Sequence, residues 1–116
     1  MTKTKKIKTL KENFMFSKLY SKGKSFSSRT VAMYFLKNYI RDITKIGITV
    51  SKNRGNAVVR NRVKRKIRES YRSIYPFVKE GYIIVVVAKQ ACVNSSVADI
   101  TADLHTLLKK AALLGE

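Results

Sequence analysis

The residues with the clearest chemical implication are the Lys and Arg side chains between positions 60 and 72. Seven of these thirteen residues are basic and one, Glu69, is acidic. An apolar residue recurs every three or four positions through the same stretch, which predicts an amphipathic helix with one buried face: Val59, Val63, Ile67, Tyr71 and Ile74. Like charges four residues apart destabilise a helix by roughly 0.3 kcal/mol per pair, so a polyanionic partner would stabilise this one. A basic surface that only favours solubility is the alternative, and we favour nucleic-acid binding.

The basic side chains divide between the two sides of the apolar stripe when each residue turns the helix by about 100°. Arg62 and Lys66 project from one side. Asn56 is expected to cap the helix N-terminus after Gly55, and Pro76 follows the expected C-terminus. The other side of the stripe carries five more basic residues and one Asn: Arg60, Asn61, Lys64, Arg65, Arg68 and Arg72.

The sequence contains no residue pattern typical of a catalytic site. Asp99 and Asp103 are four residues apart, His105 has no partner at a spacing typical of acid–base catalysis, and Cys92 has no matching His. No Cys/His cluster has the spacing of a zinc site, and the segment 55–57 is too poor in Gly for a phosphate-binding loop. We therefore expect no catalytic side chain and no cofactor bound by protein side chains alone, which disfavours a self-sufficient nuclease.

The charge of the whole chain is placed as unevenly as that of the basic stretch. Residues 1–72 contain 21 Lys and Arg against three acids, whereas residues 73–116 contain four of each. This distribution is typical of a protein that binds a phosphate backbone with one part of its surface. No apolar run approaches the roughly 18 residues of a membrane span, the basic N-terminus lacks the apolar segment of a signal peptide, and one cysteine fits a reducing compartment. We expect a cytoplasmic protein with no membrane partner.

The N-terminal third is expected to supply a tail, a helix and a strand. Residues 1–9 are predicted to be a basic flexible tail, and residues 10–116 one RNA-binding domain. A short helix is predicted over 11–22, where Phe16 and Tyr20 share one face close to Lys18 and Lys22. These aromatic residues suit either a core or a platform for unpaired bases. A polar connection at 25–29 is expected to lead into a strand over 30–37.

The remaining elements complete a predicted α/β sandwich in the order α-β-β-α-β-α. Turn residues at 38–42 predict a hairpin into a strand over 44–51, whose Gly47, Thr49 and Ser51 would form a small, polar face beside Lys52 and Arg54. The segment 82–88 is apolar at every position, as in a central strand covered on both faces. A last helix is expected to begin at a capping box at 96–99. Its buried stripe is expected to comprise Val97, Ile100, Leu104, Leu107, Leu108 and Ala111.

The basic stretch also carries a recognisable pattern. Val50-Ser51-Lys52, Gly55-Asn56-Ala57-Val58 and then Arg60-Asn61-Arg62-x-Lys64-Arg65-x-x-Arg68-Glu69-x-x-Arg72 resemble the signature of the bacterial ribonuclease P protein subunit. The resemblance extends over roughly residues 7–113, through the 13–23 segment, the central strand and the leucine-rich last helix. The pattern departs from that family at Tyr20, where Phe is usual, at Asn53, where a second Lys is common, and at Lys89, where Arg is frequent.

The resemblance implies a cytoplasmic protein partner of a catalytic RNA. In that family the RNA subunit uses Mg²⁺ to remove the 5′ leader from precursor tRNA, and the protein donates no catalytic side chain. It also implies a ribosomal-protein-like sandwich with a left-handed crossover around the basic helix, although a right-handed one is the general rule. The residues implied to bind the RNA subunit are Arg60, Asn61, Arg62, Lys64, Arg65, Arg68 and Arg72. Those implied to bind the single-stranded leader are Phe16, Tyr20, Tyr34, Ser51, Lys52 and Lys89. The alternative function is that of a ribosomal-protein-like structural RNA-binding protein.

Overall fold

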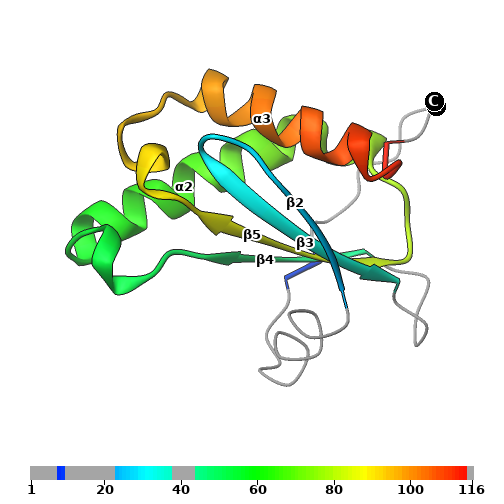
Figure 1. Cartoon of the computed structure of the whole chain (residues 1–116), viewed down its shortest axis with the longest axis horizontal. Helices are drawn as coiled ribbons and strands as arrows, with labels where there is room; N and C mark the ends of the chain where they lie inside the picture. The colour runs from blue at the N-terminus through cyan, green and yellow to red at the C-terminus, as the bar shows by residue number, and fades with distance from the viewer. Residues whose placement is uncertain (1–7, 10–22, 38–43, 115–116) are drawn as a thin grey trace.

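The computed structural model describes the backbone of residues 8–9 and the whole of residues 23–37 and 44–114. The helix predicted over 11–22 and the turn predicted at 38–42 lie outside these residues. Two α-helices, α2 and α3, lie side by side on one face of a five-stranded sheet (Figure 1). The strands are β1 (Lys8–Thr9), β2 (Lys24–Ser27), β3 (Val31–Lys37), β4 (Lys45–Thr49) and β5 (Tyr82–Ala88), and the helices are α2 (Ala57–Ile74) and α3 (Val97–Lys110). Three 3₁₀ turns join them: η1 (Lys52–Arg54), η2 (Tyr75–Phe77) and η3 (Gln90–Asn94).

Strand β5 occupies the centre of the sheet, as its apolar sequence predicts. The strand order is β1-β4-β5-β3-β2, and β5 pairs in parallel with β4 and antiparallel with β3. The predicted hairpin between β3 and β4 is therefore wrong, because β5 lies between these two strands. A strand with apolar side chains on both faces is best buried with neighbours along both edges, and this requirement overrides pairing in sequence order.

Strand β2 was not predicted from the sequence, because most of its residues are polar. Residues 25–29 were predicted to be a connection, but Lys24–Ser27 pairs antiparallel with β3, and the exposed side chains of β2 explain its polar sequence. The turn into β3 is closed by Ser28, whose N–H and hydroxyl both donate to the carbonyl oxygen of Val31, at 2.9 and 3.0 Å. The prediction is wrong here because an exposed edge strand lacks the apolar alternation that marks a half-buried one.

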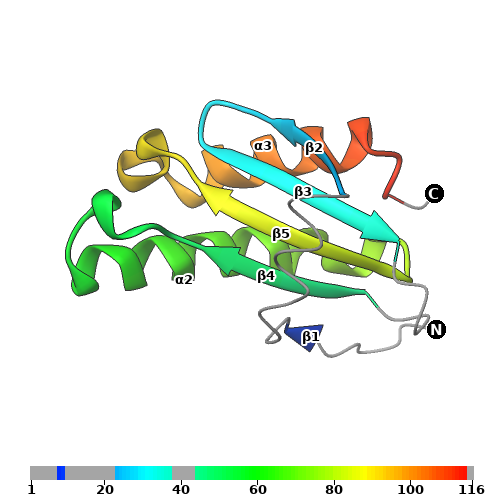
Figure 2. The same cartoon turned by 60° about the horizontal axis from the view of Figure 1, so that its bottom comes forward.

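The connection from β4 through α2 to β5 has the rarer hand. In Figure 2 the sheet faces the viewer, β4 and β5 point the same way, β5 lies above β4, and α2 passes behind the sheet. This path is a left-handed crossover, as the family resemblance implied. Because about 98% of such connections are right-handed, sequence periodicity alone would have favoured the opposite arrangement.

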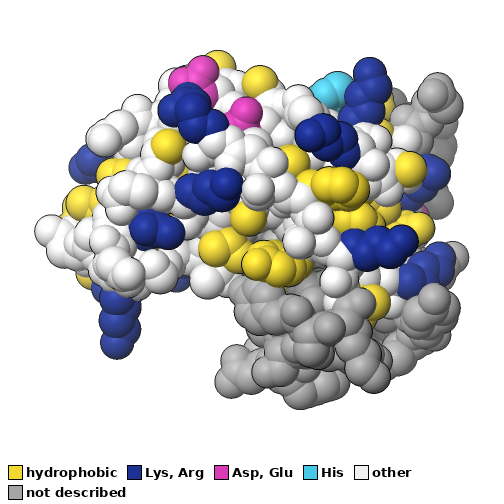
Figure 3. Space-filling model, in the orientation of Figure 1, with side chains coloured by type: hydrophobic (Ala, Val, Ile, Leu, Met, Phe, Trp, Pro, Cys, Tyr) yellow, Lys and Arg dark blue, Asp and Glu magenta, His cyan; other side chains and the backbone are white. Residues whose placement is uncertain are grey.

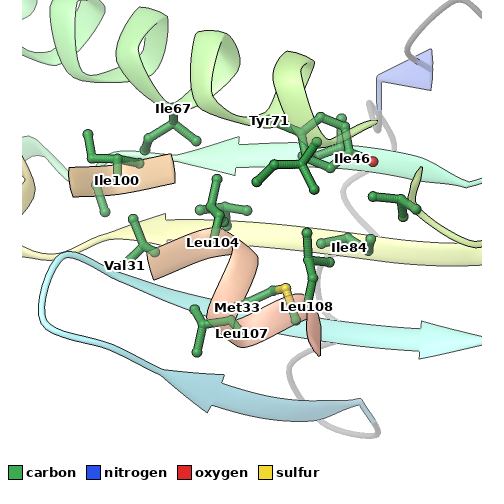
Figure 4. Close-up of a cluster of buried hydrophobic side chains, with 14 of the residues drawn as sticks. Val31, Met33, Ile46, Ile67, Tyr71, Ile84, Ile100, Leu104, Leu107 and Leu108 are labelled. Carbon is green, nitrogen blue, oxygen red and sulfur yellow. The ribbon is translucent and has the colours of Figure 1, made fainter. Parts of the chain in front are cut away.

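The core lies between the helical layer and the sheet. Figure 4 shows Ile67 and Tyr71 of α2 and Leu104 and Leu108 of α3 among the side chains that cluster there. The predicted stripe of α2 is confirmed in this core, with Val59 packed at its margin. In α3, Val97 was predicted to be buried but is 36% exposed, because it lies at the first turn and beyond the edge of the core. The other apolar residues predicted for α3 do pack in the core: Ile100, Leu104, Leu107, Leu108 and Ala111.

Tyr71 is the largest side chain buried in the core, and its hydroxyl has no hydrogen-bond partner in the described part of the chain. Burial raises the pKa of this hydroxyl, so it stays protonated and unpaired beside the Tyr75 ring, with ring centroids 5.6 Å apart. Replacing Tyr71 with Phe should raise the free energy of unfolding by about 1 kcal/mol, because the change removes an unsatisfied polar group and keeps the ring. Chemical denaturation would measure this change in the free energy of unfolding. Tyr71→Leu, which also removes the ring, should instead destabilise the fold, and a destabilised Tyr71→Phe protein would show that the hydroxyl is satisfied.

Candidate nucleic-acid interface

The basic helix begins where its capping residues predict. The side-chain oxygen Oδ1 of Asn56 accepts a hydrogen bond from the Val59 N–H at 3.0 Å, which satisfies one of the unpaired donors of the first turn. Gly55 precedes the cap with φ of 148°, a value that side chains rarely allow. Helix α2 therefore starts at Ala57 and holds the basic side chains in a fixed register along 18 residues.

The side of α2 opposite the core carries most of the predicted RNA-binding residues. Lys64 is half-buried, at the margin of the core-facing stripe. No hydrogen bond or ion pair within the described part of the chain engages the exposed arginines, so their guanidinium groups remain available to a ligand. We call this set the outer face of α2: Asn61, Arg62, Arg65, Arg68 and Arg72, all of them exposed.

Other basic side chains of the same stretch are engaged within the protein. Arg60 Nε donates to the Gly55 carbonyl oxygen at 3.2 Å, beneath the start of the helix. Lys66 Nζ donates to the carbonyl oxygens of Val93 and Ser95, at 3.0 and 2.8 Å. Arg60 keeps further N–H groups for a ligand, because a guanidinium has five donors. Lys66 has one donor left, so spacing alone overstates the number of cations that can contact a partner.

One acidic side chain, the exposed Glu69, lies on α2, and the acids of α3 lie apart from it. In Figure 3, Lys and Arg are spread across the visible face, whereas the acidic side chains lie at the top, over α3. Asp99 is exposed in the first turn of α3, where the helix dipole stabilises it, and Asp103 accepts a hydrogen bond from the Thr30 N–H at 3.2 Å. Asp99 and Asp103 thus support α3 and its packing, and Glu69 is the single acid on α2 against seven Lys and Arg. The basic surface therefore keeps its attraction for a polyanion.

Comparison with known proteins identifies the family that carries this surface. The model of the family described as Ribonuclease P matches residues 4–112. The ribonuclease P protein component of Clostridium acetobutylicum is 45% identical over 106 residues, which cover 90% of this chain and 89% of that protein. That of Clostridium beijerinckii is 42% identical, covering 92% and 90% of the two chains. This chain belongs to the ribonuclease P protein family.

Solved structures of ribonuclease P proteins have the same fold. The Staphylococcus aureus ribonuclease P protein superposes with a TM-score of 0.84 at 34% identity, covering 95% of this chain and all of that one. The Thermotoga maritima protein gives a TM-score of 0.76 at 27% identity, covering 89% and 96%. The ribosomal-protein-like α+β sandwich inferred from the resemblance is therefore confirmed.

Membership of this family gives the chain a partner and a role. Ribonuclease P is a ribonucleoprotein endoribonuclease that processes the 5′ end of precursor tRNA, and proteins of this family are its protein component. An RNA subunit is therefore a partner of this chain, and the RNA carries the chemistry. The structural RNA-binding protein that we kept as the alternative is not supported.

The side chains that might have suggested protein catalysis are unsuitable for it. Cys92 is fully buried, and burial raises the pKa of its thiol, so the nucleophilic thiolate is disfavoured. His105 is exposed on α3. Within residues 8–9, 23–37 and 44–114, no group of three or more His, Cys, Asp or Glu side chains is arranged to hold a metal ion. The same part of the chain contains no helix with the length and apolar character to cross a membrane.

The predicted leader-binding residues of this ribonuclease P protein fall into two described groups. Tyr34 lies on the sheet face opposite the helices, packed against Ile83 and Val85. Ser51 and Lys52 are exposed just after β4, and Lys89 follows β5. Because β4 and β5 are parallel, their C-terminal ends bring these three residues to one edge of the sheet. Phe16 and Tyr20 lie outside the described residues.

The face that carries Tyr34 differs from the small, polar surface predicted from β4. Gly47 and Thr49 do occupy it, but β3 and β5 add a set of apolar side chains, of which two are fully buried: Tyr34, Leu36, Ile83, Val85 and Val87. The prediction was wrong because it considered one strand, whereas strand pairing places β5 beside β4. Arg54 was expected to flank this face, yet its Nε donates to the carbonyl oxygen of Ala88 at 3.1 Å. No spacing in the sequence indicates that contact, or those of Lys66.

Proposed function

We propose that this ribonuclease P protein binds the RNA subunit through the outer face of α2 and the 5′ leader of precursor tRNA through the opposite sheet face and its edge. The observation that supports this division is the exposure of Arg62, Arg65, Arg68 and Arg72 without internal partners on a helix that packs on the other side of the sheet. Arginine suits phosphate contacts because its planar guanidinium can donate two parallel hydrogen bonds. The full set proposed for the RNA subunit is Arg60, Asn61, Arg62, Lys64, Arg65, Arg68 and Arg72.

The leader-binding surface combines aromatic and cationic side chains, which is the chemistry that single-stranded RNA requires. Bases without a pairing partner stack on aromatic rings, while Lys side chains contact the backbone. The Ser51 hydroxyl donates to Asn53 Oδ1 at 3.3 Å. Asn53, which stands where the family often has a second Lys, therefore orders the turn next to Lys52. The Lys89 ammonium donates to the Ser28 carbonyl oxygen at 2.6 Å and keeps two N–H groups for a phosphate. The proposed set is Phe16, Tyr20, Tyr34, Ser51, Lys52 and Lys89.

The proposal assigns the metal to the RNA and the protein to the cytoplasm. Mg²⁺ ions would be held by the RNA subunit and the substrate, and bound protein would lower the Mg²⁺ concentration that is needed by adding positive charge near the phosphates. A reducing, tRNA-containing compartment fits one unpaired and fully buried cysteine.

Cleavage of precursor tRNA at low Mg²⁺ tests this function. The assay compares protein alone, RNA subunit alone and the two together, with the length of the 5′ product as the readout. We expect cleavage at the mature 5′ end that is much faster with both components than with RNA alone, and none with protein alone. Cleavage by protein alone would contradict the non-catalytic role, and equal rates with and without protein would remove the assisting role.

The aromatic pair of the predicted first helix tests leader binding. Replacing Phe16 and Tyr20 together with Ala should weaken binding of leader-bearing precursor by about 10- to 100-fold, because a stacked base contributes roughly 1–3 kcal/mol. Binding of mature tRNA should change little. The measurement is the ratio of the two dissociation constants of the assembled holoenzyme. Phe77→Ala is the control, since Phe77 is a 62% exposed aromatic residue outside both proposed surfaces. Equal losses for the two tRNAs would mean that Phe16 and Tyr20 only support the core.

A further inference from the structure

The segment from Ala88 to Ser95, which we call the β5–η3 corner, is held by two basic side chains, Arg54 and Lys66. From η1, Arg54 Nε donates to the Ala88 carbonyl oxygen at 3.1 Å, and its Nη1 donates to Gln90 Oε1 at 3.4 Å. From α2, Lys66 Nζ donates to the carbonyl oxygens of Val93 and Ser95, at 3.0 and 2.8 Å. One cation therefore holds each end of the corner.

The contacts of Lys66 serve the protein interior. The last carbonyl groups of a short 3₁₀ helix lack helical partners, and an ammonium satisfies two of them here with charge-assisted hydrogen bonds. Next to it, the Ser70 hydroxyl donates to the carbonyl oxygen of Val97, the first residue of α3, at 3.2 Å, so the contact of α2 with the corner continues into the start of α3. With two of its three donors used and its side chain half-buried, Lys66 is poorly placed to neutralise a phosphate.

The corner also sets the position of Lys89, which belongs to the proposed leader-binding set. The Lys89 N–H donates to the Thr30 carbonyl oxygen at 2.9 Å, and the Lys89 carbonyl accepts from the Cys92 N–H at 3.0 Å. Its backbone is thus fixed between β3 and η3. Movement of η3 away from α2 would displace this backbone and the ammonium that it carries.

We propose that Lys66 is a positioning residue: by tying α2 to the β5–η3 corner, it holds Lys89 in place for the leader and does not contact a phosphate of the RNA subunit. The leader part of this inference rests on the proposed function. Arg54 holds the other end of the corner from η1, two residues after Lys52. Together the two contacts keep the surface for the RNA subunit and the edge for the leader at a fixed separation, so that one protein can engage both at once.

Three variants test this role in the full chain. Lys66→Met keeps a long apolar stem but cannot donate hydrogen bonds to the corner. Lys66→Arg keeps the charge and several donors and should therefore keep the corner in place. Arg54→Met releases the other end of the corner and serves as the second variant if Lys66→Met folds poorly. Arg65→Met is the matched control, because Arg65 is the exposed neighbour of Lys66 on the outer face of α2. Leu107→Val controls for a general loss of stability from the core.

The first readout is amide hydrogen exchange of the protein without RNA, which is independent of the leader. Lys66→Met should accelerate exchange at the amides of Lys89, Cys92 and Ser95 by about tenfold or more, as expected for loss of charge-assisted hydrogen bonds. Lys66→Arg, Arg65→Met and Leu107→Val should leave the protection of these amides, relative to the rest of the fold, unchanged. Unchanged protection in both Lys66→Met and Arg54→Met would overturn the clamp.

The second readout separates leader positioning from RNA-subunit binding in the assembled holoenzyme. Lys66→Met should lower the preference for leader-bearing precursor over mature tRNA about tenfold, while the salt dependence of assembly with the RNA subunit stays as in the wild type. Arg65→Met should leave the preference for leader-bearing precursor unchanged and reduce the salt slope of assembly by about 0.7–0.9. A reduced slope in Lys66→Met would show a phosphate contact and overturn the proposal. A wild-type holoenzyme without leader preference would refute the proposed function and the leader part of this inference, and hydrogen exchange would still decide on the clamp.

Discussion

Replacing Arg65, Arg68 and Arg72 together with Gln should weaken assembly with the RNA subunit by about 100-fold at moderate salt and reduce the salt slope by about 2 to 3. Each lost phosphate contact removes roughly 0.7–0.9 from that slope, because fewer counterions are released on binding. The three side chains are exposed on the outer face of α2 and have no internal partner within the described residues. Titrations of labelled RNA subunit at several salt concentrations would measure both quantities.

Protein stability should move in the opposite direction in this triple variant. Removing like charges from one helix face relieves repulsion of a few tenths of a kcal/mol per pair, so the free energy of unfolding should stay constant or rise slightly. Lys109→Gln with Lys110→Gln, on the last turn of α3, removes charge outside the proposed interface and should leave the slope unchanged. Arginine-to-lysine replacements should keep the slope and lose part of the affinity, since Lys lacks the guanidinium fork. If the salt slope of assembly in the triple variant equals that of the wild type, these arginines do not contact phosphates of the RNA subunit.

The Gly55→Ala protein is expected to lose about 3 kcal/mol of stability. A Cβ atom at Gly55 would lie 2.7 Å from Val59 Cγ1 and 2.8 Å from Val59 Cβ, inside the contact distance of two carbon atoms. The φ of 148° adds backbone strain for any L-residue with a side chain. For a domain of this size the melting temperature should fall by roughly 10 °C, which calorimetry would record.

The neighbour that causes the collision provides the control. Val59→Ala removes both Cγ atoms, so the double variant should recover part of the loss, and a double-mutant cycle would report favourable coupling between the two changes. Recovery should be incomplete because the Val59 Cβ and the φ strain remain. A fully stable Gly55→Ala protein would mean that the turn before α2 can relax, and that the start of α2 is less strictly defined.

Local patterns were sufficient to predict the basic helix and the central strand. The recurrence of Val63, Ile67 and Tyr71 places a buried face on α2, and Asn56 supplies its cap, as the structure confirms. Both follow from a few consecutive residues, for which helix geometry determines which side chains share a face. Strand β5 was predictable for the same reason, because a run of apolar residues requires burial on both sides.

The errors came from relations between segments that are distant in the chain. The turn residues after β3 predicted a hairpin, but β5 takes the position between β3 and β4. The exposed residues of β2 show no alternation of apolar and polar side chains that would predict a strand, although they pair with the central part of β3. Strand order depends on which edges compete for a common partner, and this competition is not encoded in the spacing of any one segment.

The sequence by itself determined the family, the amphipathic character of α2 and the excess of positive charge, since these depend on residue identity and local spacing. The left-handed path through α2 was implied by the family resemblance and by no periodicity of the sequence, and tertiary structure alone decided which of the cations of α2 are engaged within the protein. Arg65 reaches solvent and Lys66, one residue further, reaches the carbonyl oxygens of Val93 and Ser95. Helical periodicity predicts that these side chains point to different sides, but only packing brings the unpaired carbonyls of η3 to the side of Lys66.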